Sequence, residues 1–241
     1  METTLRQSPN SLTPARFLQR PNRFLLQVRL EDTGEVVDVH LADPGRLKEL
    51  LLPEKRVWLR PASKTERETR WTAVLVESPD GRALVSLDTT LPNRLVGEAL
   101  RNRALEEFSQ WDLVRSEFTM GRSRLDFLLS DPGGRHMALE VKSVTLVEEG
   151  VGLFPDAVTE RGARHVRDLA EIAERPGWEA GILFVLQRSD AQEVRAARSI
   201  DPKFAEALSE AKAAGVRILG RRCRVFQDRI ELSDPVPVRI G

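Results

Sequence analysis

The hydrophobic pattern of this chain changes near residue 90, and that change limits the folds open to it. Before it, short runs of alternating residues such as 24–30 (FLLQVRL) and 35–41 (EVVDVHL) are separated by turn residues and are typical of strands. About five such strands are expected before residue 87, with one short helical run from the turn at 44–45 to Leu52. This arrangement predicts a compact β-barrel of the OB-fold type.

After residue 90, helical patterns alternate with strands. The segment 91–108 (LPNRLVGEALRNRALEEF) has leucines at helical spacing, with Asn93 as a candidate cap. A pair of strands flanks the turn at 131–134, and further helices are predicted at about 159–174 and 201–215. The alternation predicts an α/β domain. We therefore expect two domains, a nucleic-acid-binding barrel at 1–87 and an α/β domain at 88–241.

The charge balance, the cysteine count and the lengths of the apolar runs exclude several classes of protein. The 37 lysines and arginines balance 37 aspartates and glutamates, which excludes a globally basic nucleic-acid binder but allows a local basic patch. Cys223 is the single cysteine, so a disulfide framework and a thiolate metal site are excluded. No run of consecutive apolar residues is long enough for a membrane span, and no apolar stretch follows a basic start. We expect a cytoplasmic protein.

The best local basic patch lies in the first domain. Two tryptophans, Trp58 and Trp71, interleave with its basic residues, as a base-stacking platform requires. The alternative is a solvated loop with both tryptophans in the core. The patch holds eight basic residues against four glutamates: Arg46, Lys48, Lys55, Arg56, Arg60, Lys64, Arg67 and Arg70.

Three ionisable residues interrupt the apolar strand pair at 123–144. Because side chains alternate along a strand, Glu140 and Lys142 share one face, and the turn brings Asp126 toward the same face if the register allows it. Two converging carboxylates repel each other unless a cation or proton intervenes, and Mg²⁺ favours such oxygen ligands. Glu98 on the preceding helix offers a third carboxylate. The alternative is a solvated strand face.

The segment 154–165 (FPDAVTERGARH) is a second candidate functional element. Asp156 or Thr159 is suited to cap the following helix by accepting backbone N–H bonds. Arg161, Arg164 and His165 lie near the start of that helix, where they either face the carboxylates and bind phosphate or lie on the solvated surface.

Two long segments, 123–146 (SRLDFLLSDPGGRHMALEVKSVTL) and 152–169 (GLFPDAVTERGARHVRDL), closely resemble the sugar fermentation stimulation protein A (SfsA) family. The likeness extends over nearly the whole chain, through FLQRPNRFLLQV, DPGRLKEL, PNRLVGEAL, ARSIDPKFAEAL and AAGVRIL. The resemblance implies an N-terminal OB-fold domain, a C-terminal PD-(D/E)XK nuclease-like domain, and DNA binding.

Carried over position by position, the resemblance places the metal carboxylates at Asp126 and Glu140, the lysine at Lys142 and the helix acid at Glu98. Leu125 stands where the motif has the proline that names it, a departure that weakens the pattern match more than the chemistry.

Two hypotheses follow from these patterns. The first is a phosphodiesterase that uses Mg²⁺ or Mn²⁺, with Asp126, Glu140 and Glu98 as metal ligands and Lys142 orienting water or stabilising charge. The second is a DNA-binding regulatory protein with a vestigial site. A sugar-metabolising enzyme has no support, because no separate carboxylate pair and no glycine-rich nucleotide loop is present. We expect DNA, and no membrane, as the partner, and leave open whether the chain forms a homodimer. The predicted DNA contacts are Arg46, Arg60, Lys64, Arg67, Arg70, Arg161, Arg164 and His165.

Overall fold

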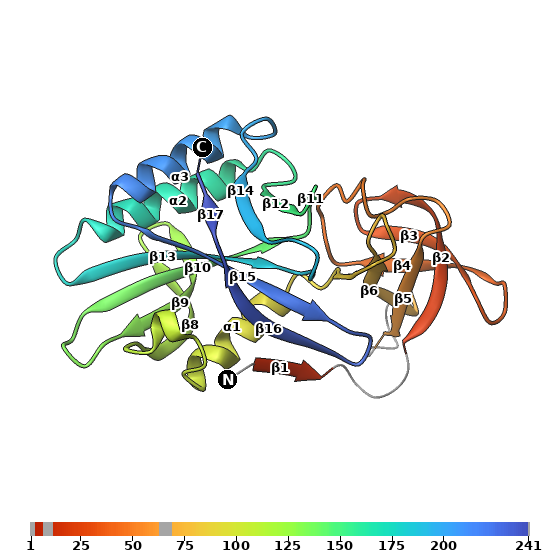
Figure 1. The fold of residues 1–241 in the computed structure, drawn as a ribbon, viewed down its shortest axis with the longest axis horizontal. Helices are drawn as coiled ribbons and strands as arrows, with labels where there is room; N and C mark the ends of the chain where they lie inside the picture. The colour runs from red at the N-terminus through yellow and green to blue at the C-terminus, as the bar shows by residue number, and fades with distance from the viewer. Residues whose placement is uncertain (1–2, 7–11, 63–68, 241) are drawn as a thin grey trace.

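The computed structural model describes residues 3–6, 12–62 and 69–240, which form a barrel domain and a larger α/β domain (Figure 1). The barrel sheet has the strand order β4-β3-β2-β5-β6-β7, and an additional β4–β6 pairing closes five of its strands. Its strands are β2 (Thr13–Asn22), β3 (Leu25–Leu30), β4 (Val36–Leu41), β5 (Arg56–Pro61), β6 (Trp71–Glu77) and β7 (Leu84–Ser86). The barrel is filled by alternate residues of these strands, such as Leu26 and Val28 of β3.

The α/β domain is built on a seven-stranded sheet of order β1-β16-β15-β13-β10-β9-β8. Its strands are β1 (Thr3–Arg6), β8 (Asp112–Met120), β9 (Ser123–Ser130), β10 (His136–Val144), β13 (Trp178–Leu186), β15 (Arg217–Val225) and β16 (Arg229–Val236). A small second sheet contains β11 (Val147–Glu148), β12 (Val151–Phe154), β14 (Glu193–Ala196) and β17 (Val238–Arg239). The helices are α1 (Leu91–Arg101), the short 3-10 helix η1 (Glu106–Phe108), α2 (Glu160–Ala173) and α3 (Pro202–Ala213).

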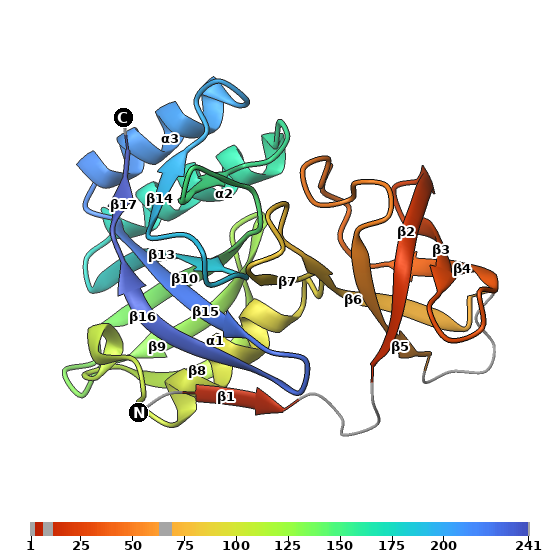
Figure 2. The same cartoon turned by 45° about the vertical axis from the view of Figure 1, so that its right-hand side comes forward.

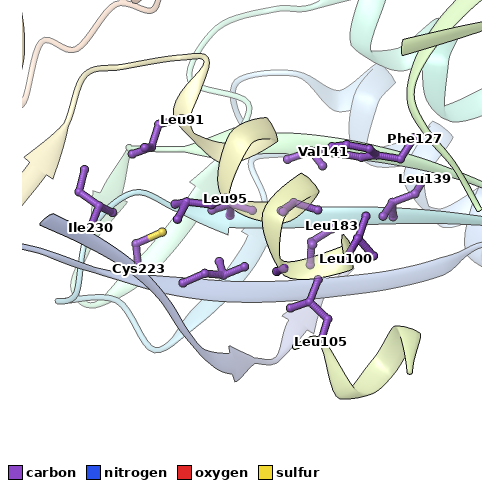
Figure 3. Packing of buried hydrophobic residues seen from close by; sticks show 14 of the residues in the cluster. Leu91, Leu95, Leu100, Leu105, Phe127, Leu139, Val141, Leu183, Cys223 and Ile230 are labelled. Carbon is purple, nitrogen blue, oxygen red and sulfur yellow. The ribbon is translucent and has the colours of Figure 1, made fainter. Parts of the chain in front are cut away.

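Helices cover both faces of the seven-stranded sheet. Leu95 and Leu100 of α1 pack over Leu139 and Leu183 on one face (Figure 3). The other face is covered by α2 and α3. Because β13 is buried on both sides, its residues contribute alternately to the two cores, which explains the uninterrupted apolar run GILFVL in the sequence.

The first strand of the chain crosses to the C-terminal sheet. β1 pairs antiparallel with β16, in the register Thr3↔Leu232 to Arg6↔Arg229 (Figure 2). Residues 3–6 therefore belong to the sheet of the α/β domain, although the predicted range 1–87 places them in the barrel domain. A four-residue edge strand has too few residues for its pattern to identify its partner. The boundary between residues 87 and 88 stays a prediction.

Two local predictions are wrong. Thr90, not Asn93, is the N-cap position of α1, and Asn93 lies inside the helix. Pro92 explains the start, because a proline suits the first helical turn, where no N–H partner is needed. The helical run toward Leu52 is a single turn, in which the N–H groups of Leu50 and Leu51 both donate to the carbonyl of Leu47. None of the helices among the described residues is long and apolar enough to cross a membrane.

Candidate active site

Asp126, Glu140 and Lys142 come together where β9 and β10 separate. The antiparallel pairing of the two strands ends at Leu139↔Phe127, immediately before Glu140 and after Asp126. Beyond it, the N–H of Val141 donates to Asp126 Oδ2 at 2.7 Å, so a side chain takes the place of the strand partner. The second oxygen, Oδ1, accepts a hydrogen bond from Asn93 Nδ2 at 2.7 Å. The Asp126 carboxylate is therefore held from two directions.

The Glu140 carboxylate is almost fully buried, with 5% of the residue exposed. Its Oε1 accepts from Lys142 Nζ at 2.6 Å and lies 2.8 Å from His165 Nδ1. Its Oε2 is buried, and no group in the described part of the chain forms a hydrogen bond with it. Lys142 reaches Glu140 because residues two apart on a strand share a face, as the sequence predicted.

The two carboxyl groups have pKa values displaced in opposite directions. Burial raises the pKa of Asp126, the negative charge of Glu140 raises it further, and the N–H of Val141 only partly offsets these effects. Burial alone would also raise the pKa of Glu140, but the hydrogen bond from His165 and the charge of Lys142 hold that pKa below its ordinary value. Glu140 is therefore the more firmly ionised of the pair.

The structure gives His165 a different role from the predicted DNA contact. His165 is 4% exposed, because it lies on the buried stripe of α2 with Val166 and Leu169. Its Nδ1 faces Glu140, and Arg161 donates to its Nε2 at 3.4 Å. Arg161 and Arg164 are exposed on the same helix, as a contact with DNA requires.

The predicted helix acid, Glu98, is half-buried on α1 and lines the same hollow as Asp126. Among the residues that the structure describes, however, no three acidic, histidine or cysteine side chains are grouped as a metal-binding cluster. The charges of Asp126 and Glu140 interact directly, whereas Glu98 shares only the hollow with Asp126.

The predicted basic patch lies only partly within the described residues. Lys64 and Arg67 lie outside the described residues. Arg46, Arg60 and Arg70 are at least partly exposed. The predicted stacking platform is wrong for Trp58, which is 5% exposed and packs in the core next to residues of α1. Trp71 is half-buried against the barrel core.

A cleft of about 600 Å³ lies between the domains and is lined by Asn93, Lys142 and Ser143 on one side and by the barrel loop 43–45 on the other. Asp156 does not cap α2. Its Oδ2 instead accepts from the N–H of Arg46 at 2.9 Å, which joins the two domains. Thr159 is the cap, and its hydroxyl accepts from the N–H of Gly162.

Two residues of the site were missed or misassigned from the sequence. The sequence offers Asn93 only as a candidate cap and leaves His165 either facing the carboxylates or on the solvated surface, whereas each contacts a carboxylate of the site. The only signal for His165 was its place on the apolar stripe of the predicted helix. No sequence signal pointed from Asn93 to Asp126.

Comparison with known proteins bears on both domains. The family model described as "SfsA N-terminal OB domain" matches residues 18–87. The family model described as "Sugar fermentation stimulation protein RE domain" matches residues 90–229. The sugar fermentation stimulation protein homolog of Shouchella clausii is 48% identical over 227 residues, covering 94% of this chain and 97% of that protein. The homolog of Moorella thermoacetica is 44% identical over 233 residues, covering 96% and 98%.

The solved structure of Pyrococcus furiosus SfsA in complex with Ca²⁺ superposes with a TM-score of 0.87 at 29% identity and covers 100% of both chains. The predicted order of an OB-fold barrel followed by an α/β domain is confirmed, and the α/β domain is the part matched as the sugar fermentation stimulation protein RE domain. With both domains matched and relatives similar over almost their full length, the chain belongs to the sugar fermentation stimulation protein family.

Proposed function

We propose that this protein binds DNA and hydrolyses a phosphodiester bond at a divalent metal held by Asp126 and Glu140. The observation that carries the proposal is Glu140 Oε2, a carboxylate oxygen that is buried and has no hydrogen-bond partner among the described residues. A buried polar atom without a partner is rare and needs an explanation. A cation shared with Asp126 would satisfy it and would also remove the repulsion that raises the pKa of Asp126.

The donor chemistry fits a hard divalent cation. Both side chains offer carboxylate oxygens, which Mg²⁺ and Mn²⁺ prefer, and Mg²⁺ commonly binds through one or two carboxylates plus water and phosphate oxygens. The Ca²⁺ in the Pyrococcus furiosus relative supports a cation with oxygen ligands. When bound, such a metal would lower the pKa of a coordinated water and stabilise charge on the phosphate.

The chain's own residues would prepare this site. Asn93 and the N–H of Val141 fix the orientation of Asp126, and Lys142 fixes Glu140. Lys142 also lines the cleft between the domains, where its ammonium group would attract a phosphate. The OB-fold barrel across the cleft supports a nucleic acid as the bound polymer, and a cytoplasmic location is part of the proposal.

One observation favours the second candidate, a DNA-binding protein without hydrolysis. No third acidic side chain joins Asp126 and Glu140 as a metal-binding cluster in the described ranges.

The experiment that separates the candidates measures DNA binding and cleavage for the parent, Asp126→Asn, Glu140→Gln and Lys142→Met, in chelator and in Mg²⁺ or Mn²⁺. In chelator, removing a negative charge should leave affinity level or raise it. With metal, the two carboxylate variants should lose metal-promoted binding and cleavage together. Lys142→Met should bind more weakly in both conditions and should not cleave.

Glu148→Gln, at an exposed position of β11, is the matched control and should behave like the parent. Identical behaviour of all variants would overturn the site. A parent that binds DNA but cleaves neither single-stranded, duplex nor branched DNA with either metal would select the second candidate.

A further inference from the structure

Three arginines from three separate elements gather where the barrel meets the C-terminal sheet. Arg6 ends β1, Arg60 lies on β5, and Arg94 lies near the start of α1. All three line one small hollow of about 90 Å³, and we call them the junction arginines. β1 brings Arg6 to this place by pairing with β16, where Arg6 lies opposite Arg229 (Figure 2).

The junction arginines carry more positive charge than the lining of their hollow neutralises. Asp88 is the acidic residue of that lining, so three guanidinium groups face one carboxylate. Its Oδ2 lies 3.9 Å from the guanidinium groups of both Arg60 and Arg94. Its Oδ1 already accepts from the N–H and the hydroxyl of Thr90. The side chains of Arg60 and Arg94 are 42% and 52% exposed, so an anion in solution can reach them.

The hollow of the junction arginines continues toward the candidate active site. Leu5 and Arg94 line both it and a neighbouring hollow of about 360 Å³. That second hollow is lined by Asp126 and by Arg101, the last residue of α1. Asn93, the residue before Arg94, is the one that donates to Asp126. A ligand that bridges the two hollows would therefore run along α1 from the junction arginines to Asp126.

We infer that the junction arginines bind the phosphodiester backbone of a nucleic-acid strand and direct it along α1 to Asp126; this inference rests on the proposed function. A guanidinium fork matches the paired oxygens of a phosphate, and a cluster of two or three forks suits a polyanion better than a single small anion. Because the three arginines come from both domains, the strand would bridge barrel and sheet at this junction, and not stack on the buried Trp58.

The first test is the salt dependence of DNA binding, measured in chelator for the parent, Arg6→Gln, Arg94→Gln and the double variant. Each lost phosphate contact should flatten the slope of log K against log salt by about 0.7 to 0.9, and the double variant should lose about twice that. Arg175→Gln, an exposed arginine after α2, is the matched control and should keep the parental slope. Calorimetric titration of Mn²⁺ verifies that each variant keeps its fold and its metal site.

The second test locates the strand. The only native cysteine, Cys223, is buried, so Arg94→Cys can be labelled selectively with a thiol-linked photo-crosslinker. Arg94→Cys should cross-link to bound DNA, and Arg175→Cys should not.

The outcomes are distinct. A parent that binds DNA while the double variant keeps the parental slope, or while both cysteine variants cross-link equally, would overturn this inference and leave the proposed function in place. A parent that binds no DNA in either chelator or Mg²⁺ would overturn both.

Discussion

The buried ion pair between Glu140 and Lys142 can be measured by a double-mutant cycle in metal-free protein. Lys142 Nζ lies 2.6 Å from Glu140 Oε1, and the two side chains are 13% and 6% exposed. Removing one partner of a buried pair costs about 3–5 kcal/mol, because the remaining charge is left uncompensated. We expect about 3 kcal/mol for Lys142→Met, the low end, since His165 still lies against Glu140.

Glu140→Gln should cost less, about 1–2 kcal/mol, because the amide oxygen still accepts a hydrogen bond and Lys142 can extend into the cleft. The double variant removes both charges, so its cost should fall short of the sum of the two single costs by about 2 kcal/mol.

The assay is urea-induced unfolding at pH 7 in chelator, with the free energy of unfolding compared across the parent, the two single variants and the double variant. Lys203→Met, at an exposed position of α3, is the control for loss of a lysine and should change stability by less than about 0.5 kcal/mol. Additive costs, within about 0.5 kcal/mol, would show that the two side chains do not interact as their separation implies and would refute the reasoning.

Three further predictions concern single positions. Because the folded-state pKa of Asp126 is raised by burial and by Glu140, its ionisation opposes folding, and stability falls as pH rises from the ordinary aspartate pKa through the raised folded-state pKa. Asp126→Asn should therefore raise the metal-free melting temperature at pH 7, and this gain should vanish below about pH 3. A Cβ on Gly45 would clash with Asp156 Oδ2, so Gly45→Ala should cost about 1–3 kcal/mol in urea unfolding, and adding Asp156→Ala should recover part of that cost. Trp58→Ala should cost about 3–5 kcal/mol as a core residue, whereas a loss of DNA affinity at unchanged stability would restore the stacking hypothesis.

Much of the fold can be predicted from the sequence because helix caps, apolar stripes and turn residues are local features of the chain. The caps of α2 and α3 are Thr159 and Asp201, each followed by a helical apolar stripe. The strands β9 and β10 flank a turn whose residues, Asp-Pro-Gly-Gly, favour chain reversal. By contrast, the place of β1 depends on pairing with β16, more than 200 residues away in sequence, and four residues carry no pattern that specifies such a partner.

The contacts of the candidate site that are local in sequence were likewise predictable, and the long-range contacts were not. Glu140 and Lys142 share a face by strand alternation, which is a property of the sequence itself. Asn93 and Asp126 are 33 residues apart, and His165 and Glu140 are 25 apart, so their contacts arise only when α1 and α2 pack on the sheet. The stacking role predicted for Trp58 is wrong for a related reason. Its basic neighbours suggest a surface, but the docking of α1 beside the barrel buries it.

The surroundings of the two carboxylates explain how two like charges can be kept close together in a buried place. Glu140 is kept ionised by Lys142 and His165, which both contact Oε1, while Oε2 has no partner in residues 3–6, 12–62 and 69–240. Asp126 accepts two hydrogen bonds from neutral groups, but burial and the negative charge of Glu140 raise its pKa. Without a cation between them, the charge of Glu140 therefore destabilises ionised Asp126. Adjacent carboxyl groups whose pKa values are shifted in opposite directions are typical of functional sites. A purely structural ion pair would need neither the unpartnered oxygen nor the second carboxylate, and this is why the arrangement favours a metal site over a solvated strand face.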